Sequence, residues 1–146
     1  MESEKIIHAI IAVFSGADER NWKKVQNAMA DNVLLDYSSL SGSPAATLPS
    51  EQIIETWISF LPGFDRTHHQ LSNFQVTRHS DTAKVHCDGK ADHFIDREVW
   101  TVEGSYDAEV IKINNRWVMT MLKFNLSKQS GNTNLPAQVS ERLKTK

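Results

Sequence analysis

Polar and apolar residues alternate with a period of two through the middle of this chain. Between residues 82 and 93 the odd positions are apolar or small except for one histidine, and the even positions are polar. Such alternation predicts a strand with one buried face and one exposed face. His93 falls on the buried face. In residues 66–73 the same rule places His69 on the apolar side and directs the adjacent His68 outward.

The first part of the chain has the spacing of an amphipathic helix. Apolar residues recur every three or four positions, which predicts one helix, or two in line with a joint near Gly16, ending at Asn32. Asp18 interrupts this stripe and has two interpretations: an N-cap of the second helical segment, or a carboxylate directed at an interior partner. The residues of the stripe are Ile7, Ile11, Phe14, Asp18, Trp22, Val25 and Met29.

Short elements are predicted next. A short strand at 33–38 leads into a segment at 39–50 that is rich in glycine, proline and serine, which is typical of a loop. A second helix is expected to begin at Ser50 and to end at Pro62-Gly63, because proline and glycine stop a helix.

After this helix the pattern predicts four antiparallel strands. A bulge is expected near Ser72-Asn73, where the alternation changes parity, and Asn114-Asn115 is typical of a hairpin turn. This order of elements is typical of an α+β fold. Gly104 within a long strand favours curvature, so we expect a cone-shaped, strongly curved, mainly antiparallel sheet wrapped around the N-terminal helices and enclosing a chamber. Residues 1–126 would form this domain, and residues 127–146 a polar C-terminal tail that allows a short terminal helix at 136–143.

Composition narrows the possible functions. The chain has 146 residues, of which 40% are hydrophobic and 23% charged, as in an ordinary globular protein of one domain. Its formal net charge is −2 with no basic cluster, which argues against nucleic-acid binding. Cys87 is the only cysteine, so no internal disulfide is expected. The longest apolar run near the N-terminus, at 9–14, is too short for a membrane span, and no signal-peptide pattern is present, so we expect a cytoplasmic protein.

Two histidines on one apolar face are candidates for proton transfer, because histidine titrates near neutral pH. Each could instead be a buried histidine whose hydrogen bonds a neighbour satisfies. We expect Asp18, Tyr37, His69 and His93 to point into the chamber. The side chains expected to contact a substrate there are Trp57, which also suits the hydrophobic core, Trp100 and Tyr106.

The order and length of the elements resemble the nuclear transport factor two-like superfamily and, within it, the SnoaL-like group. Four short motifs resemble, in order and spacing, the active-site motifs of the scytalone dehydratases. They are Asp18 with Trp22 four residues later, Asp36-Tyr37, Thr67-x-His69 and Asp92-His93. The resemblance extends roughly from Ile7 to Phe124 and implies the same α+β barrel-like fold.

The resemblance also implies roles for the site residues. His69 would be the general acid–base group, and Asp18 would orient His93 and favour its charged form. Tyr37 would hold a carbonyl oxygen and stabilise enolate-like negative charge. No cofactor is implied.

Two positions depart from the pattern of those enzymes. Ala17 stands where they have a second oxygen-binding tyrosine, and Tyr106 stands where they have a polar asparagine. Because both positions contact the substrate in those enzymes, we expect a different substrate here.

Three functions stay open on this evidence. The first is a dehydratase-like lyase or an isomerase that acts on a hydroxylated cyclic or polyketide-like carbonyl compound by acid–base chemistry. The second is a binding module that holds a small hydrophobic ligand in the same chamber. The third treats His69, His93 and Asp18 as a two-histidine, one-carboxylate metal site. The superfamily further implies a homo-oligomer, either a dimer or a trimer.

Overall fold

The computed structural model describes residues 2–144, and side chains as far as Arg142. The helices are α1 (Glu2–Glu19), α2 (Trp22–Asn27), α3 (Ser38–Ser41), α4 (Ser50–Ile58), the 3-10 helix η1 (Leu61–Gly63) and α5 (Leu135–Lys144). The strands are β1 (Met29–Asp36), β2 (Ala46–Pro49), β3 (Arg66–His79), β4 (Thr82–Ile95), β5 (Glu98–Ile113) and β6 (Arg116–Gly131).

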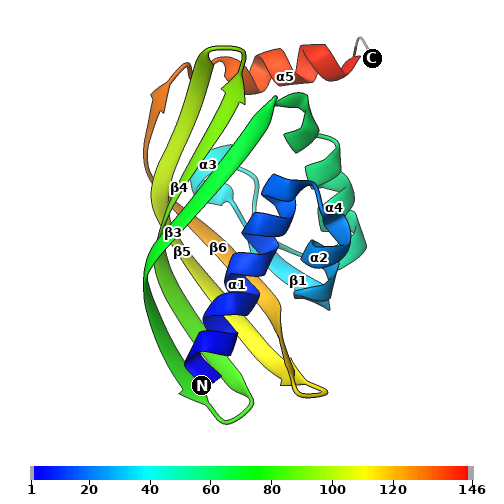
Figure 1. The fold of residues 1–146 in the computed structure, drawn as a ribbon, viewed down its shortest axis with the longest axis vertical. Coiled ribbons are helices and arrows are strands. Elements are labelled where there is room, and N and C mark those ends of the chain that lie inside the picture. Colours follow the sequence, from blue (N-terminus) through cyan, green and yellow to red (C-terminus); the bar gives the residue numbers. More distant parts are fainter. Residues whose placement is uncertain (1, 145–146) are drawn as a thin grey trace.

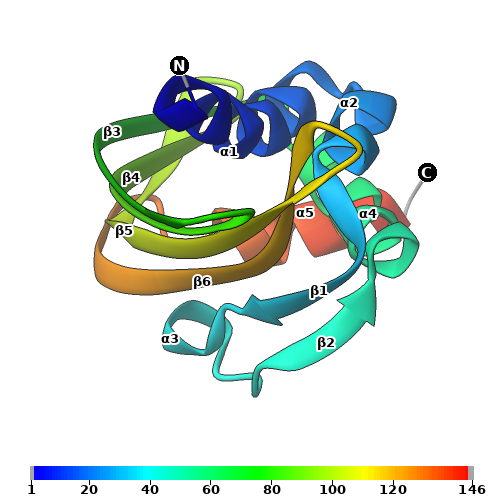
Figure 2. The same ribbon diagram turned by 90° about the horizontal axis from the view of Figure 1, so that it is seen from below.

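The strands form one sheet in the order β2-β1-β6-β5-β4-β3. β1 runs parallel to β6, and all other neighbours are antiparallel. The sheet curls around α1, and its edge strands β2 and β3 lie at opposite ends of the curl, so the sheet does not close (Figures 1 and 2). The predicted α+β fold with a strongly curved sheet is therefore confirmed.

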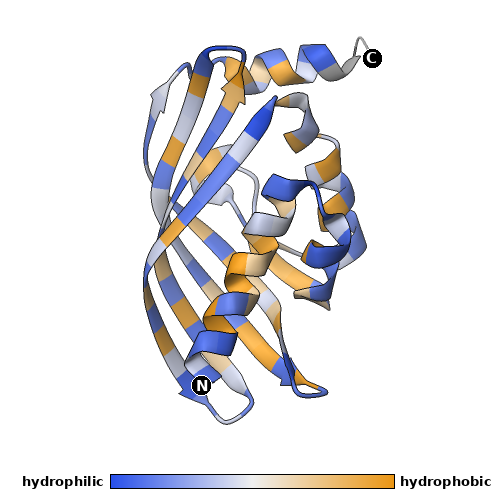
Figure 3. Ribbon diagram, viewed as in Figure 1, coloured by the Kyte–Doolittle hydropathy of each residue, from blue (hydrophilic) through white to orange (hydrophobic). Residues whose placement is uncertain are grey.

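Alternate residues of the long strands face the interior. In β4 all odd-numbered residues from Ala83 to Ile95 are buried, as the alternation predicted, and hydrophilic and hydrophobic positions alternate along the strands in Figure 3. The predicted bulge is present in β3, where the register shifts between Ser72 and Gln75. The register between β5 and β6 shifts at Gly104, where a Cβ atom would collide with the carbonyl oxygen of Asn125, so only glycine permits this close approach.

Helix α1 lies in the hollow of the sheet and buries Phe14 of the predicted stripe, but in its first half the buried face is shifted by one residue. Ile6 and Ile10 are fully buried, whereas Ile11 is 39% exposed. The sequence has isoleucine pairs at both positions, so two neighbouring stripes fit the spacing, and packing against the sheet selects the first. The helix continues through Gly16 and ends before Arg20, which has a positive φ of 59°.

The second helical segment is short. Asn21, not Asp18, caps α2: its side chain accepts a hydrogen bond from the backbone N–H of Lys24 at 3.2 Å. This helix ends at Asn27, and β1 begins at Met29, so the expected helical end at Asn32 is wrong. Asp18 is therefore free for another role.

Two further segments contain regular structure: the expected loop at 39–50, and the C-terminal tail, where the sequence allowed a short helix at 136–143. The expected loop at 39–50 contains most of α3 and the edge strand β2. The expected boundary at 126 falls inside β6, and α5 then places Leu135 and Val139, both fully buried, against the core. No helix within the described chain has the combination of length and apolar character that a membrane crossing requires.

Candidate active site

A cavity of about 340 Å³, here called the chamber, lies between the concave face of the sheet and helices α1, α3 and α4. Its walls are mainly apolar. The aromatic side chains that line it are Phe14, Tyr37, Trp57, Phe60, Trp100, Tyr106 and Phe124. Among the described residues, no lysine, arginine, aspartate or glutamate lines the chamber, and the two imidazoles in its wall belong to His69 and His93.

His69 projects from β3 into this wall, and its side chain is 11% exposed. Its Nδ1 lies 2.7 Å from Oδ1 of Asp18. A carboxylate only accepts hydrogen bonds, so Nδ1 carries the hydrogen. Nε2 has no hydrogen-bond partner among the described residues and is the nitrogen available to a molecule in the chamber.

Asp18, in the last turn of α1, is held by three donors. Oδ1 accepts from the ring of His69 and from the hydroxyl of Thr67 at 2.9 Å, and Oδ2 accepts from the backbone N–H of His69 at 2.7 Å. Thr67 in turn accepts from Nη1 of Arg20 at 3.0 Å, and Nη2 of Arg20 donates to the carbonyl of Leu61. This chain of hydrogen bonds joins the end of α1 to β3 and η1.

These donors determine the charge of Asp18. Burial acts to raise the pKa of its carboxyl group, but the hydrogen bond and the attraction to His69, with the hydroxyl of Thr67, outweigh burial and lower the pKa below its ordinary value. Asp18 is therefore ionised at neutral pH.

His93 lies deeper in the wall, is 5% exposed, and has a different partner. Its Nδ1 lies 3.0 Å from the backbone carbonyl oxygen of Trp100. A carbonyl oxygen only accepts, so this nitrogen also carries the hydrogen. Burial lowers the pKa of His93 to about 4, with a further lowering by His69 and opposing contributions from the carbonyl and from carboxylates. The ring is therefore neutral at pH 7.

The expected pairing of Asp18 with a charged His93 is wrong. The strand register pairs Thr67 with His93 and His69 with Ala91, which offsets the two histidines along the sheet. Helix α1 ends against the edge strand β3, so its carboxylate meets His69 first, and His93 lies one strand further in. The ring centroids of the two histidines are 6.2 Å apart.

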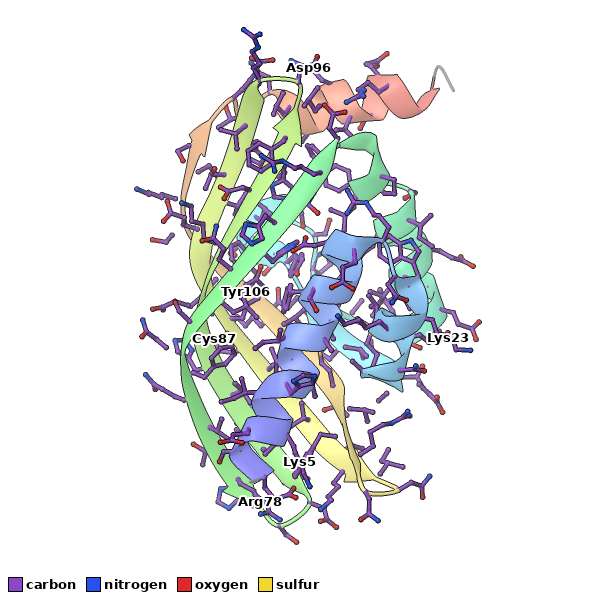
Figure 4. The ribbon with its side chains drawn as sticks, in the orientation of Figure 1. Lys5, Lys23, Arg78, Cys87, Asp96 and Tyr106 are labelled. Carbon is purple, nitrogen blue, oxygen red and sulfur yellow. The ribbon has the colours of Figure 1, made fainter. Side chains whose placement is uncertain are left out.

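Tyr37 and Tyr106 provide the phenol groups of the chamber. Tyr37 follows β1, and Tyr106 lies near the middle of β5 (Figure 4). Both rings pack on Phe124, with centroid distances of 5.9 and 5.0 Å. Burial raises the pKa of each tyrosine, and their hydroxyl groups lie close enough to interact with each other. Both are therefore neutral phenols that can donate hydrogen bonds.

The position of Tyr106 depends on a glycine in the neighbouring strand. A Cβ atom at Gly89 of β4 would collide with the ring of Tyr106, and on its other side this ring packs on Phe14 at a centroid distance of 4.7 Å. The two strands therefore leave one space that the ring fills. Sequence reasoning selected Tyr106 but gave no role to Gly89.

The two tryptophans predicted to contact a substrate also line the chamber, whereas Asp18 does not. Trp57 of α4 and Trp100 of β5 are both in its wall, as expected. The indole N–H of Trp100 donates to the side chain of Gln129 at 2.8 Å, so the ring offers only its apolar surface. Asp18 lies behind His69 and is not itself in the wall. The roles of all these residues stay predictions.

Sequence reasoning missed part of the network. Thr67 was recognised only as a neighbour of His69, and Arg20 was not singled out, since nothing in its spacing shows that it binds backbone carbonyls. The proposed metal site also lacks support: within the described chain, no three histidine, cysteine or acidic side chains come together closely enough to hold an ion.

Comparison with known proteins identifies the family and the fold. The sequence model of the SnoaL-like domain family matches residues 2–123, and the chain belongs to this family. No curated protein matches the sequence. Among solved structures, a protein from Kribbella flavida is 24% identical with a TM-score of 0.87, covering 92% of this chain and 96% of its own.

Two further structures are similar at lower identity. A candidate scytalone dehydratase from Novosphingobium aromaticivorans is 17% identical, with a TM-score of 0.74 over 88% of this chain and 86% of its own. A hexachlorocyclohexane dehydrochlorinase (LinA, type 2) is 13% identical, with a TM-score of 0.76 over 89% and 88%. Identities this low show the fold alone, which is that of the nuclear transport factor two-like proteins.

Proposed function

We propose that this protein is a lyase or isomerase that acts on a hydroxylated carbonyl compound by acid–base chemistry without a cofactor. The observation that carries the proposal is the Asp18–His69 pair, in which a partly buried carboxylate fixes the imidazole at 2.7 Å and leaves Nε2 for the chamber. A carboxylate behind a histidine is a recurring way to orient a general base and to stabilise its protonated form.

The proposed reaction begins at the carbon next to the carbonyl group. Nε2 of His69 removes a proton from this carbon, and negative charge moves to the carbonyl oxygen. Hydrogen bonds from the hydroxyl groups of Tyr37 and Tyr106 would stabilise that charge, and they would count for more in an apolar chamber than in water. The imidazolium then returns the proton, either to a departing hydroxyl, which leaves as water, or to a second carbon.

His69 is the only proton-transfer group in this scheme. His93 holds its hydrogen against the carbonyl of Trp100 and is neutral at pH 7, so it has no proton to donate to a leaving group. When one group both removes and returns a proton, both steps occur on the same face of the substrate. We therefore propose a syn elimination or a suprafacial isomerisation.

The names of two similar structures agree with this reaction class, since a dehydratase and a dehydrochlorinase both carry out eliminations. Their low identity means that they support the proposal only through the shared fold.

A second candidate function is a binding module for a small hydrophobic ligand. The mainly apolar and aromatic lining of the chamber favours it. A pure binding site gains nothing, however, from a buried carboxylate that orients an imidazole. The two functions differ in one observable, the transfer of a proton to or from carbon.

The test is proton exchange and turnover with a panel of cyclic β-hydroxy ketones in deuterated water, followed by proton NMR. We expect dehydration, or exchange of the hydrogen next to the carbonyl, with wild type and a loss of at least 100-fold in rate with His69→Gln. His68→Gln changes the adjacent exposed histidine and is the matched control. Binding of the ketones with neither exchange nor dehydration would favour the binding module.

A further inference from the structure

Helix α1 ends in a backbone motif in which one position is usually glycine. The backbone N–H of Asn21 donates to the carbonyl of Gly16 at 2.8 Å, and that of Arg20 donates to the carbonyl of Ala17 at 3.2 Å. This pair of hydrogen bonds is the Schellman motif, and it requires a left-handed residue at Arg20, where φ is 59°. Glycine adopts this conformation without strain, whereas a side chain makes it unfavourable. The sequence therefore has arginine where the backbone favours glycine.

The side chain of Arg20 binds three groups around the proposed base and its carboxylate partner. Nη1 donates to the carbonyl of Ala17 at 2.8 Å and to the hydroxyl oxygen of Thr67 at 3.0 Å, and Nη2 donates to the carbonyl of Leu61 at 2.8 Å. The residue is half-buried and forms no direct ion pair with any described residue. Burying a cation without a paired anion costs free energy. An unfavourable backbone and a half-buried cation at one residue indicate that its side chain serves the site.

The chemistry of the groups determines the direction of each hydrogen bond. A guanidinium only donates, so the oxygen of Thr67 accepts from Arg20. The single hydroxyl hydrogen of Thr67 is then left for Oδ1 of Asp18, at 2.9 Å. With this donor and with the ring and backbone N–H groups of His69, the carboxylate of Asp18 has three donors. The donors therefore run in one direction, from Arg20 through Thr67 to Asp18.

We propose that Arg20 is a positioning residue that directs the hydroxyl hydrogen of Thr67 to Asp18 and thereby keeps the ring hydrogen of His69 on Nδ1. This inference rests on the proposed function, because Nε2 of His69 can act as a base only while the hydrogen is on Nδ1. Arg20 does not line the chamber, so it acts through Thr67 and not by contact with a substrate. Without the guanidinium, the hydroxyl of Thr67 is free to rotate away and Asp18 loses a donor.

Two substitutions at this position separate positioning from stability. Arg20→Gly removes the side chain and suits the left-handed backbone, whereas Arg20→Ala removes the side chain and keeps the strain. Arg20→Gly should therefore have the higher Tm of the two by a few degrees, while kcat falls by about 10-fold in both. Arg97→Ala, at the exposed turn between β4 and β5, is the control and should change neither quantity. If kcat follows Tm, so that Arg20→Gly keeps the wild-type rate, the residue is only structural and the proposal is overturned.

A double-mutant cycle tests whether the effect of Arg20 passes through Thr67. Thr67→Val removes the hydroxyl group that receives the hydrogen bond from the guanidinium. In a Thr67→Val background, Arg20→Gly should therefore lower kcat by less than about 2-fold, because the contact that it removes is already absent. If the two substitutions act independently, so that their losses in kcat multiply, Arg20 does not act through Thr67 and the proposal is wrong.

Nitrogen-15 NMR of the histidine rings measures the position of the hydrogen without a substrate. At pH 8, above the ordinary histidine pKa of about 6.5, the wild-type protein should show His69 with its hydrogen on Nδ1. In Arg20→Gly we expect a mixture of the two neutral forms of this ring and faster exchange of its hydrogen with water. His86, whose Nδ1 lies 2.7 Å from Asp107 on the outer face of the sheet, is the internal control and should not change.

The positioning role and the proposed function can fail separately. If the wild-type protein turns over none of the ketones, the proposed function fails, and the NMR signals of the His69 ring alone decide the role of Arg20. If turnover is present but the His69 signals of Arg20→Gly match those of wild type, the positioning role is overturned and the proposed function stands. A loss of the Nδ1 hydrogen signal in Arg20→Gly, with an unchanged His86, supports the positioning role in either case.

Discussion

The carboxylate of Asp18 accepts hydrogen bonds from both the ring Nδ1 and the backbone N–H of His69, each at 2.7 Å. One side chain at the end of α1 therefore fixes the imidazole and the main chain of the edge strand β3 together. The orientation of the proposed base is set by the same contacts that join the helix to the sheet, so we expect changes here to affect folding and the proposed activity jointly.

Asp18→Asn should lower both the stability of the fold and the rate of the proposed reaction. An asparagine has one acceptor oxygen, so its NH₂ group would face one of the N–H donors of His69 and a buried hydrogen bond would be lost. We expect the free energy of unfolding at pH 7 to fall by about 1.5–3 kcal/mol, and kcat by about 100-fold or more. Urea unfolding measures the free energy of unfolding, and steady-state kinetics measure kcat. Asp31→Asn, on the exposed side of β1, is the control and should change neither.

The loss of stability caused by Asp18→Asn should depend on pH. The pKa of Asp18 is lower in the folded protein than its ordinary value of 3.8, so the unfolded chain takes up the proton first as the pH falls. The stabilisation from this carboxylate is complete above the unfolded pKa and is lost as the pH falls through the folded pKa. The difference in unfolding free energy between wild type and Asp18→Asn should therefore shrink in acid. A difference that stays constant down to the acid limit of the folded state would contradict the role of the charge.

Thr67→Val tests the hydrogen-bond chain behind Asp18. The hydroxyl of Thr67 accepts from Arg20 and donates to Asp18, and valine has nearly the same shape without the hydroxyl. We expect a loss of about 1–2 kcal/mol in stability and roughly a 10-fold lower kcat with little change in KM, because Asp18 loses a positioning contact that the substrate never touches. Thr77→Val, at an exposed position of the same strand, is the control. A rise in KM with an unchanged kcat would mean that Thr67 shapes the chamber instead.

Local rules predicted the strands well and the helix face poorly. The residues of β4 alternate without ambiguity, so their inner and outer faces could be assigned, and His93 lies on the buried side as predicted. The isoleucine pairs of α1 fit two stripes one residue apart, so spacing could not choose between Ile6 and Ile7. Only the contact of the helix with the sheet decides which stripe is buried.

The partners of the site residues depend on long-range geometry. The alternation placed both histidines on one face, but which one meets Asp18 is fixed by the register of β3 on β4 and by where α1 ends. The hydrogen bond from His93 to a backbone carbonyl also has no sequence signal, because every residue has such a carbonyl. The expected homo-oligomer and cytoplasmic location stay predictions.

Acid should destabilise the protein through His93 at a higher pH than through Asp18. Burial lowers the pKa of His93 to about 4, below the ordinary histidine value of 6.5, so between these values the unfolded chain binds a proton that the folded protein does not. Stability should fall as the pH decreases from about 6.5 to 4, by up to roughly 3 kcal/mol from this residue. In His93→Gln this fall in stability with decreasing pH should disappear. The exposed control His79→Gln should retain the fall. Parallel curves for wild type and His93→Gln in urea unfolding between pH 7 and 4.5 would contradict this.

Gly89→Ala should displace Tyr106, because the added methyl group would collide with its ring, which cannot retreat past Phe14. We expect a loss of about 1–3 kcal/mol in unfolding free energy, as in other overpacked cores. Tyr106→Phe removes only the hydroxyl, so it should change stability by about 1 kcal/mol or less while kcat falls roughly 10-fold to 100-fold through loss of a donor to the carbonyl oxygen. If the collision is the cause, Gly89→Ala should cost almost nothing in a Tyr106→Ala background, where the space is empty, and a double-mutant cycle measures this coupling directly. Equal costs in both backgrounds would mean that Gly89 is needed for the backbone of β4 and not for the placement of Tyr106.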